Sequence, residues 1–160
     1  MKYTRTGKTG NEKYRVTEKG RYVLLGCMNS VDQTFMVKRN NGKVLAKMHK
    51  GHLTVYPDYA WDGVTYGPDV PCAMEASLVH DALYQIIREK MRLPKESEAR
   101  LMECADRHLY CWVKDNCSSW LASTMYNAVR GYQTAGFIGG ALGLIWGAIR
   151  GIFMQEFACA

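Results

Sequence analysis

The chain has 160 residues, of which 48% are hydrophobic and 22% are charged, a balance that excludes a disordered protein and suits one globular domain. Its net charge of +6 is unevenly distributed, because residues 1–50 carry +9 and the remainder carries −3. The basic character therefore belongs to the N-terminal third, which argues against nucleic-acid binding by the whole chain.

Residues 1–20 are polar and basic, and we expect them to form a basic arm, either flexible or folded as an edge hairpin. They contain no apolar segment of the kind found in a cleavable signal peptide. We therefore expect a protein that is not exported and whose six cysteines stay reduced and unbridged. These cysteines are Cys27, Cys72, Cys104, Cys111, Cys117 and Cys159.

Four short runs with the character of β-strands follow, at residues 21–26, 34–38, 43–48 and 52–56. Asn41-Gly42 predicts a hairpin turn between the second and third runs, because both residues tolerate positive φ. The lysines on these strands indicate that one face of the sheet meets water. Residues 57–71 are rich in proline, glycine and aromatic side chains, and we expect a loop that frames a site.

Helical periodicity begins after Pro71 and stops at Pro94. Further helices are expected over residues 95–114 and 119–132, the last capped by Ser118 or Ser119. The order of elements predicts an α+β fold: a small N-terminal antiparallel sheet, a helical hairpin-type domain and a C-terminal glycine-zipper helix. The corresponding ranges are a basic arm at 1–20, the α+β domain at 21–133 and a glycine-rich apolar helix at 134–160.

The residue types suited to chemistry gather around the first predicted helix. His80 and Tyr84 lie one turn apart on the same face of that helix, and Asp81 lies at the edge of this face. Asp106 lies on the next predicted helix. If the two helices are antiparallel, Asp106 comes near His80, and a carboxylate on one imidazole nitrogen leaves the other nitrogen available as a base.

The runs Trp61-Asp62-Gly63, Ser-Leu-Val-His-Asp-Ala-Leu-Tyr-Gln at 77–85, Ala105-Asp106 and Tyr-Asn-Ala-Val-Arg-Gly at 126–131 resemble a phage-associated domain of unknown function. The resemblance covers about residues 59–133. It implies a phage or prophage gene, and it supplies no biochemical role.

The His-Asp-x-x-Tyr helix is also similar to that of phospholipase A2, especially the disulfide-poor viral form. This resemblance implies a Ca²⁺-dependent hydrolase in which His80 activates a water molecule, Asp106 orients His80, and Tyr84 supports the pair. It further implies a Ca²⁺ ion, which takes carboxylate and carbonyl oxygens. The implied ligands are Asp81, Tyr66, Gly67 and Asp69, and the implied supporting loop is Trp61, Asp62 and Gly63.

Three interpretations of this cluster stay open at the level of the sequence. His80, Tyr84 and Asp106 can be a hydrogen-bonded anchor between two helices, since buried polar groups need partners whether or not they catalyse. They can instead form the Ca²⁺-dependent lipid esterase, or a non-catalytic site for a ligand or a host protein.

The C-terminal region carries no charge from residue 134 to residue 149. Gly139, Gly143, Gly147 and Gly151 recur every four residues and predict close helix packing. Residues 134–149 span about 24 Å as a helix, and residues 134–154 about 31 Å, which is marginal for a hydrocarbon core of about 30 Å. Insertion into a membrane, contact in a soluble oligomer and packing in the chain's own core all remain open.

Together these features predict a phage accessory protein in the host cytoplasm or at the cytoplasmic membrane. The expected partners are the host membrane or an anionic lipid, a further copy of the chain through the C-terminal helix, and a host protein. Nucleic acid is not expected as a partner. The alternative function is that of a soluble oligomeric protein that sequesters or inhibits a host factor.

Overall fold

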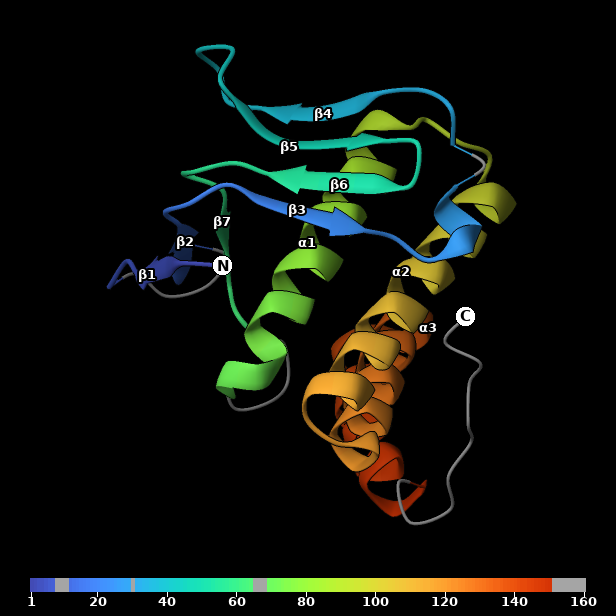
Figure 1. Cartoon of the computed structure of the whole chain (residues 1–160). Coiled ribbons are helices and arrows are strands. Elements are labelled where there is room, and N and C mark those ends of the chain that lie inside the picture. The colour runs from blue at the N-terminus through green and yellow to red at the C-terminus, as the bar shows by residue number, and fades with distance from the viewer. Residues whose placement is uncertain (8–11, 30, 65–68, 151–160) are drawn as a thin grey trace. The chain divides into compact units, whose positions relative to one another are not determined.

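Two small antiparallel sheets and three long helices make up the part of the chain that the computed structural model describes, residues 1–7, 12–29, 31–64 and 69–150 (Figure 1). The strands come first and the helices follow, which confirms the predicted α+β class. The chain forms two compact units. The first contains Met1–Gly63 and Leu78–Cys104, and the second contains Val64–Ser77 and Ala105–Ala160.

The smaller sheet of the first unit has the strand order β1-β2-β7. Its strands are β1 (Tyr3–Arg5), β2 (Tyr14–Val16) and β7 (Ala60–Trp61). Tyr14 pairs with Trp61 in the ladder, and the rings of Tyr3 and Trp61 meet edge to face at 5.4 Å between centroids. The segment 1–20 thus forms a hairpin at its described residues. The segment 57–71, expected to be a loop, contains the short strand β7. Its ladder partners in β2 lie 45 and 47 residues earlier in the chain, so local sequence did not indicate this strand.

The larger sheet has the strand order β3-β6-β5-β4. Its strands are β3 (Gly20–Val23), β4 (Phe35–Lys38), β5 (Val44–His49) and β6 (His52–Val55). Alternate residues are buried on one face, as expected for a sheet with one solvated side. The buried residues on this face are Tyr22, Val37, Ala46, Met48, Leu53 and Val55.

Two tight turns set the register of this sheet. Gly42 has a φ of +82°, and its N–H donates to the carbonyl of Arg39, which confirms the Asn41-Gly42 turn. Lys50 and Gly51 connect β5 to β6 with φ values of +45° and +68°, and His49 pairs with His52 directly beyond them. Positive φ at both central residues is the pattern of a two-residue hairpin. The sequence pattern did not indicate this second turn.

The long helices are α1 (Met74–Lys90), α2 (Lys95–Asn116) and α3 (Ser119–Arg150). Short 3-10 turns lie at Gly26–Met28 (η1) and Pro71–Ala73 (η2). The hydroxyl oxygen of Ser118 accepts the N–H of Leu121 at 3.2 Å, which confirms the predicted cap. The third helix does not stop at residue 132 but continues to Arg150, since residues 133–135 include no helix breaker.

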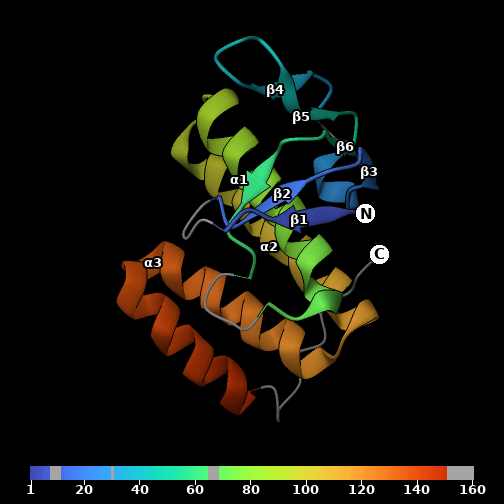
Figure 2. The ribbon, with the colours of Figure 1, turned by 90° about the vertical axis from the view of Figure 1, so that its left-hand side faces the viewer.

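In the first unit, α1 lies against one face of the four-stranded sheet, as the two views in Figures 1 and 2 show. Val79, Leu83, Ile86 and Ile87 of α1 are all buried. They recur at helical spacing, so the apolar residues that predicted the helix are also the ones that pack it against its neighbours. Because the residues between them are mostly buried as well, polar groups on α1 are drawn into the interior.

Disulfides join cysteines that the sequence analysis expected to be free. Cys27 of η1 is bonded to Cys104 of α2 in the first unit, with their Cα atoms 6.3 Å apart. Cys72 is bonded to Cys117 in the second unit, with a Cα separation of 5.7 Å. Both separations lie in the usual range. Cys111 is disulfide-bonded too, and no described cysteine is free. The expectation of unbridged thiols was wrong, because it rested on the N-terminal composition and not on which cysteines meet.

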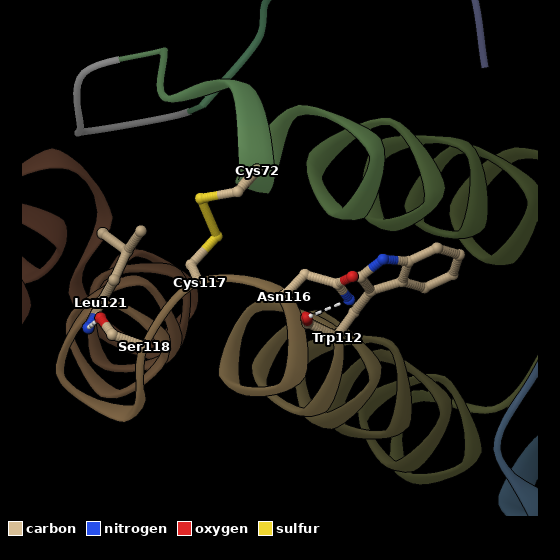
Figure 3. The surroundings of a disulfide bond; sticks show 6 residues. All are labelled: Cys72, Trp112, Asn116, Cys117, Ser118 and Leu121. Carbon is tan, nitrogen blue, oxygen red and sulfur yellow. Dashed lines mark hydrogen bonds between the residues drawn. A yellow bond between two sulfur atoms is a disulfide. The ribbon is translucent and has the colours of Figure 1, made fainter.

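The second unit packs α3 against the later part of α2. The rings of Tyr110 and Tyr126 meet edge to face at 6.0 Å, and Leu109, Val113 and Met125 are buried near them in sequence. Figure 3 shows the Cys72–Cys117 bond next to the Ser118 cap, at the connection between α2 and α3. This bond therefore holds η2 to the start of α3.

None of the helices in the described residues is both long enough and apolar enough to cross a membrane.

Replacing Gly51 with alanine should destabilise the fold more than the same change at Gly42. Both positions have positive φ, which costs a side chain about 1–2 kcal/mol. A Cβ at Gly51 would in addition collide with the side-chain oxygen of Asn29, whereas a Cβ at Gly42 meets nothing within 4 Å. Urea unfolding of the two variants would measure the difference, and equal losses would contradict this close approach.

Replacing Cys72 and Cys117 with serine should lower the free energy of unfolding by about 2–4 kcal/mol, because the bond closes a long loop in the unfolded chain. The bonded residues are 45 apart in sequence. Thermal unfolding with and without reductant provides the control. The variant and the parent should differ without reductant and converge with it, and equal stability without reductant would contradict the bond.

Candidate active site

His80 lies on α1 and is 7% exposed. Its Nδ1 is 3.4 Å from Oδ1 of Asp81, the next residue along the helix. The side chain of Asp81 is 27% exposed, so the carboxylate is the member of the pair that meets solvent. Within the described residues, His80 is its only hydrogen-bond or ion-pair partner. Among the described residues, therefore, no arginine or lysine side chain pairs with the Asp81 carboxylate.

Tyr84 supports the histidine from one turn further along α1. The two rings stack at 4.1 Å between centroids with an angle of 36° between their planes. The guanidinium of Arg88, a further turn on, lies 5.1 Å from the Tyr84 ring centroid. Spacing of four residues places these three side chains on one face of the helix. Tyr84 thus contacts His80, and its supporting role in catalysis stays a prediction.

Tyr59 lies between β6 and β7, and the pKa of its phenol depends on carboxylates that include two on α1. It is 3% exposed, and burial raises the pKa of its phenol well above the ordinary value of 10.0. Negative charge raises this pKa further, and the contributing carboxylates are Asp81, Glu89 and Asp62. Asp62, which follows Trp61 of β7, and Asp81 of α1 therefore act on the same buried phenol.

Asp106 lies on α2 in the second unit and is completely buried. Gln133 of α3 donates an amide N–H to Oδ2 of Asp106 at 3.1 Å, and Nη1 of Arg130 donates to the same oxygen at 3.4 Å. Arg130 also donates to the side-chain oxygen of Gln133 at 3.1 Å. Asp106 thus belongs to a polar network between α2 and α3. Its expected contact with His80 would join the two units and stays a prediction.

The loop implied to hold Ca²⁺ is only partly within the described residues, because Tyr66 and Gly67 lie outside them. Asp69 is described, and its Oδ1 accepts the N–H of Val64 at 2.9 Å. Ca²⁺ takes six to eight oxygen ligands. The described residues contain no group of three or more His, Cys, Asp or Glu side chains placed for a metal ion. Asp81 offers one carboxylate, and the Ca²⁺ assignment stays a prediction.

The remaining predicted positions are distributed over both units. Trp61 is buried in β7, and Gly63 has a φ of +90°, so the Trp61-Asp62-Gly63 run leaves the strand through a turn that favours glycine. Gly139, Gly143 and Gly147 lie on α3, and Gly151 lies outside the described residues. The close packing expected of these glycines stays a prediction.

Sequence reasoning missed three contributors to the two polar clusters. Tyr59 is one of several aromatic residues in the segment 57–71, and no motif distinguishes it from the others, although Asp62 is close to it in sequence. Arg130 belongs to the run 126–131 that resembles the phage-associated domain, and this resemblance implies no role for it. Gln133 follows three residues later, at the spacing that places it on the same side of the helix as Arg130. That spacing was the available signal.

Comparison with protein-family models, with curated proteins and with solved structures finds no match to this chain. The assignment of a function therefore depends on the geometry of its own residues.

Stability should fall at high pH because of Tyr59. Its pKa is raised in the folded chain, so above pH ~10 the unfolded chain loses a proton that the folded chain keeps, and stability decreases by at most about 1.4 kcal/mol per pH unit. Tyr59→Phe should remove this component. Urea unfolding between pH 8 and pH 11 would test it, and a variant whose stability falls as steeply as that of the parent would contradict the assignment.

Proposed function

We propose that this chain is a phage accessory protein that acts at the host membrane, where its His80–Asp81 site hydrolyses ester bonds of phospholipids. The observation that carries the proposal is the pairing of a nearly buried imidazole with a partly exposed carboxylate that has no cationic side chain as a partner in the described residues.

In the proposed reaction, His80 removes a proton from a water molecule, and the hydroxide oxygen bonds to the ester carbonyl carbon. The bond from that carbon to the alkoxy oxygen then breaks, and the proton passes from the imidazole to the leaving oxygen. The products are a fatty acid and a lysophospholipid. A positioned base of this kind contributes about 10²–10⁴-fold to a rate.

Neighbouring side chains keep the imidazole in position. Stacking on Tyr84 limits rotation of the His80 ring, and the Asp81 carboxylate favours an imidazolium when His80 takes the proton. Because Nδ1 faces Asp81, Nε2 is the nitrogen that takes the proton from water, and Asp106 is not assigned to that nitrogen. A role of Asp106 in orienting the ring stays a prediction. Ca²⁺, if it is held by Asp81 and loop carbonyls, would polarise the ester carbonyl.

The bridged cysteines bear on where this reaction would take place. Disulfides form and persist in oxidising compartments and are rare in the cytosol. We therefore propose the outer face of the host cytoplasmic membrane as the site of action, in place of the host cytoplasm expected from the sequence. The closed bonds Cys27–Cys104 and Cys72–Cys117 support this location.

Incubating the full chain with phosphatidylglycerol vesicles and Ca²⁺ should release fatty acid, and chelation of Ca²⁺ should stop the release. His80→Asn and Asp81→Asn should each lower the rate by at least 10²-fold. The first replaces the imidazole base with a smaller polar side chain, and the second keeps the shape of the side chain and removes its charge. His108→Asn is the matched control, since it removes a second buried histidine on a helix. It should retain activity.

Fatty-acid release that is unchanged in the His80→Asn variant would contradict the proposal. No release from any form, together with a discrete oligomer in sedimentation, would instead support the soluble binding protein. The exposure of Leu142 and Ile145 on α3, at 52% and 57%, is the observation that favours such self-association.

A further inference from the structure

The four-stranded sheet has one buried face and one open face, and the open face is basic. Side chains that alternate with the buried set point away from α1. Lys19 and Arg21 lie on or beside β3, Lys38 ends β4, and Lys47 lies in the middle of β5. We define Lys19, Arg21 and Lys47 as the basic face. Lys38 is left out, because a register shift between Val37 and Lys38 interrupts the alternation there. None of the four strands contains an aspartate or a glutamate.

Strand register places two of these charges in one row across the sheet. Arg21 pairs with Thr54, and Thr54 pairs in turn with Lys47 on its other side. Neighbouring strands lie about 4.8 Å apart, so Arg21 and Lys47 are about 10 Å apart with a small polar residue between them. Two like charges are thus held at a fixed spacing on a rigid surface.

The charges of the basic face are not neutralised within the described chain. Lys19, Arg21 and Lys47 form no ion pair there. Basic side chains elsewhere in the first unit do have acidic partners, as in Lys2–Glu18 at 2.7 Å and Lys43–Asp58 at 2.6 Å. The Lys43 ammonium lowers the pKa of the Asp58 carboxyl. The open charges therefore gather on one face of one sheet.

Apolar side chains share this face. Val23, at the end of β3, is 72% exposed, and Met36 and Leu45 are half-buried at alternating positions. Tyr56 directly follows β6, and the Lys19 ammonium lies over its ring at 5.4 Å from the centroid. Sheets that bind single-stranded nucleic acid expose aromatic rings on which bases stack. Open cations with small apolar neighbours suit a lipid surface better.

We infer that the basic face binds the anionic phospholipid surface of a membrane. Charge complementarity selects the occupant, because three cations that form no ion pair in the described residues lie on a face that has no acidic strand residue. This inference builds on the proposed function, since it names the surface through which the protein would meet its lipid. It places the contact on the first unit, which also carries His80 and Asp81.

Binding of the full chain to vesicles that contain phosphatidylglycerol and phosphatidylcholine, measured by co-sedimentation at low salt, tests this inference. The double variant R21Q/K47Q should weaken binding about 30-fold, because each basic residue near an anionic surface contributes about 1 kcal/mol. The matched control K95Q/R100Q removes two exposed charges from α2 in the same unit. It should weaken binding less than threefold.

Several outcomes would overturn the inference. If the two double variants lost vesicle binding equally, binding would depend on the net charge of the protein and not on the basic face. If the parent bound equally well to vesicles of phosphatidylcholine alone, binding would not depend on anionic lipid. Loss of binding in L142S/I145S but not in R21Q/K47Q would move the contact to α3. Tighter binding to a single-stranded oligonucleotide than to vesicles, lost in R21Q/K47Q, would assign the face to nucleic acid.

The His80→Asn variant separates this inference from the proposed hydrolysis. It should bind anionic vesicles as the parent does. If the parent releases no fatty acid but binds through the basic face, the hydrolase fails and the membrane surface stands. If hydrolysis depends on His80 while R21Q/K47Q binds normally, the hydrolase stands and the basic face fails.

Discussion

The burial of α1 is the constraint on which the candidate site depends. Val79, Leu83 and Ile86 pack α1 on the sheet, and most of the other side chains on this part of the helix are buried as well. His80 comes between these apolar residues and is carried into the interior with them. A buried imidazole needs a polar neighbour, and Asp81 and Tyr84 provide a carboxylate and a ring at close range. The same packing that stabilises the helix therefore determines the chemistry that His80 can perform.

Charge is separated within the first unit in a way that follows from its layers. Within the described residues, the cations of the basic face form no ion pair, while the carboxylates of Asp81, Glu89 and Asp62 raise the pKa of the buried Tyr59. The hydrophobic layer of Leu53, Val55 and the apolar stripe of α1 lies on the buried side of the sheet. An apolar layer reduces screening by water between charges on its two sides. The first unit thus has basic side chains on the open face of its sheet and the Asp81 carboxylate next to the candidate base, His80.

Local patterns in the sequence predicted local structure well. The spacing of apolar residues from Val79 to Ile87 predicted α1, and Asn41-Gly42 predicted its turn, because both signals involve residues close in the chain. What escaped prediction depends on distant partners. The pairing of β7 with β2 and the bond between Cys27 and Cys104, 77 residues apart, arise only once the chain has folded. For the site, the proximity of His80, Asp81 and Tyr84 was predictable from helix geometry. The contribution of Tyr59 and the Arg130–Gln133 partners of Asp106 required contacts between elements.

The two bonds Cys27–Cys104 and Cys72–Cys117 share a topological property. Each joins a cysteine that precedes the short connection between α1 and α2 to one that follows it. Arg92, in this connection, is exposed and has a φ of +48°, so the backbone is accessible there. A protease that cut the chain at Arg92 would produce two fragments linked by both bonds. The molecule would thus survive a break in its main chain as a single covalent object, and would separate into two pieces only in a reducing environment.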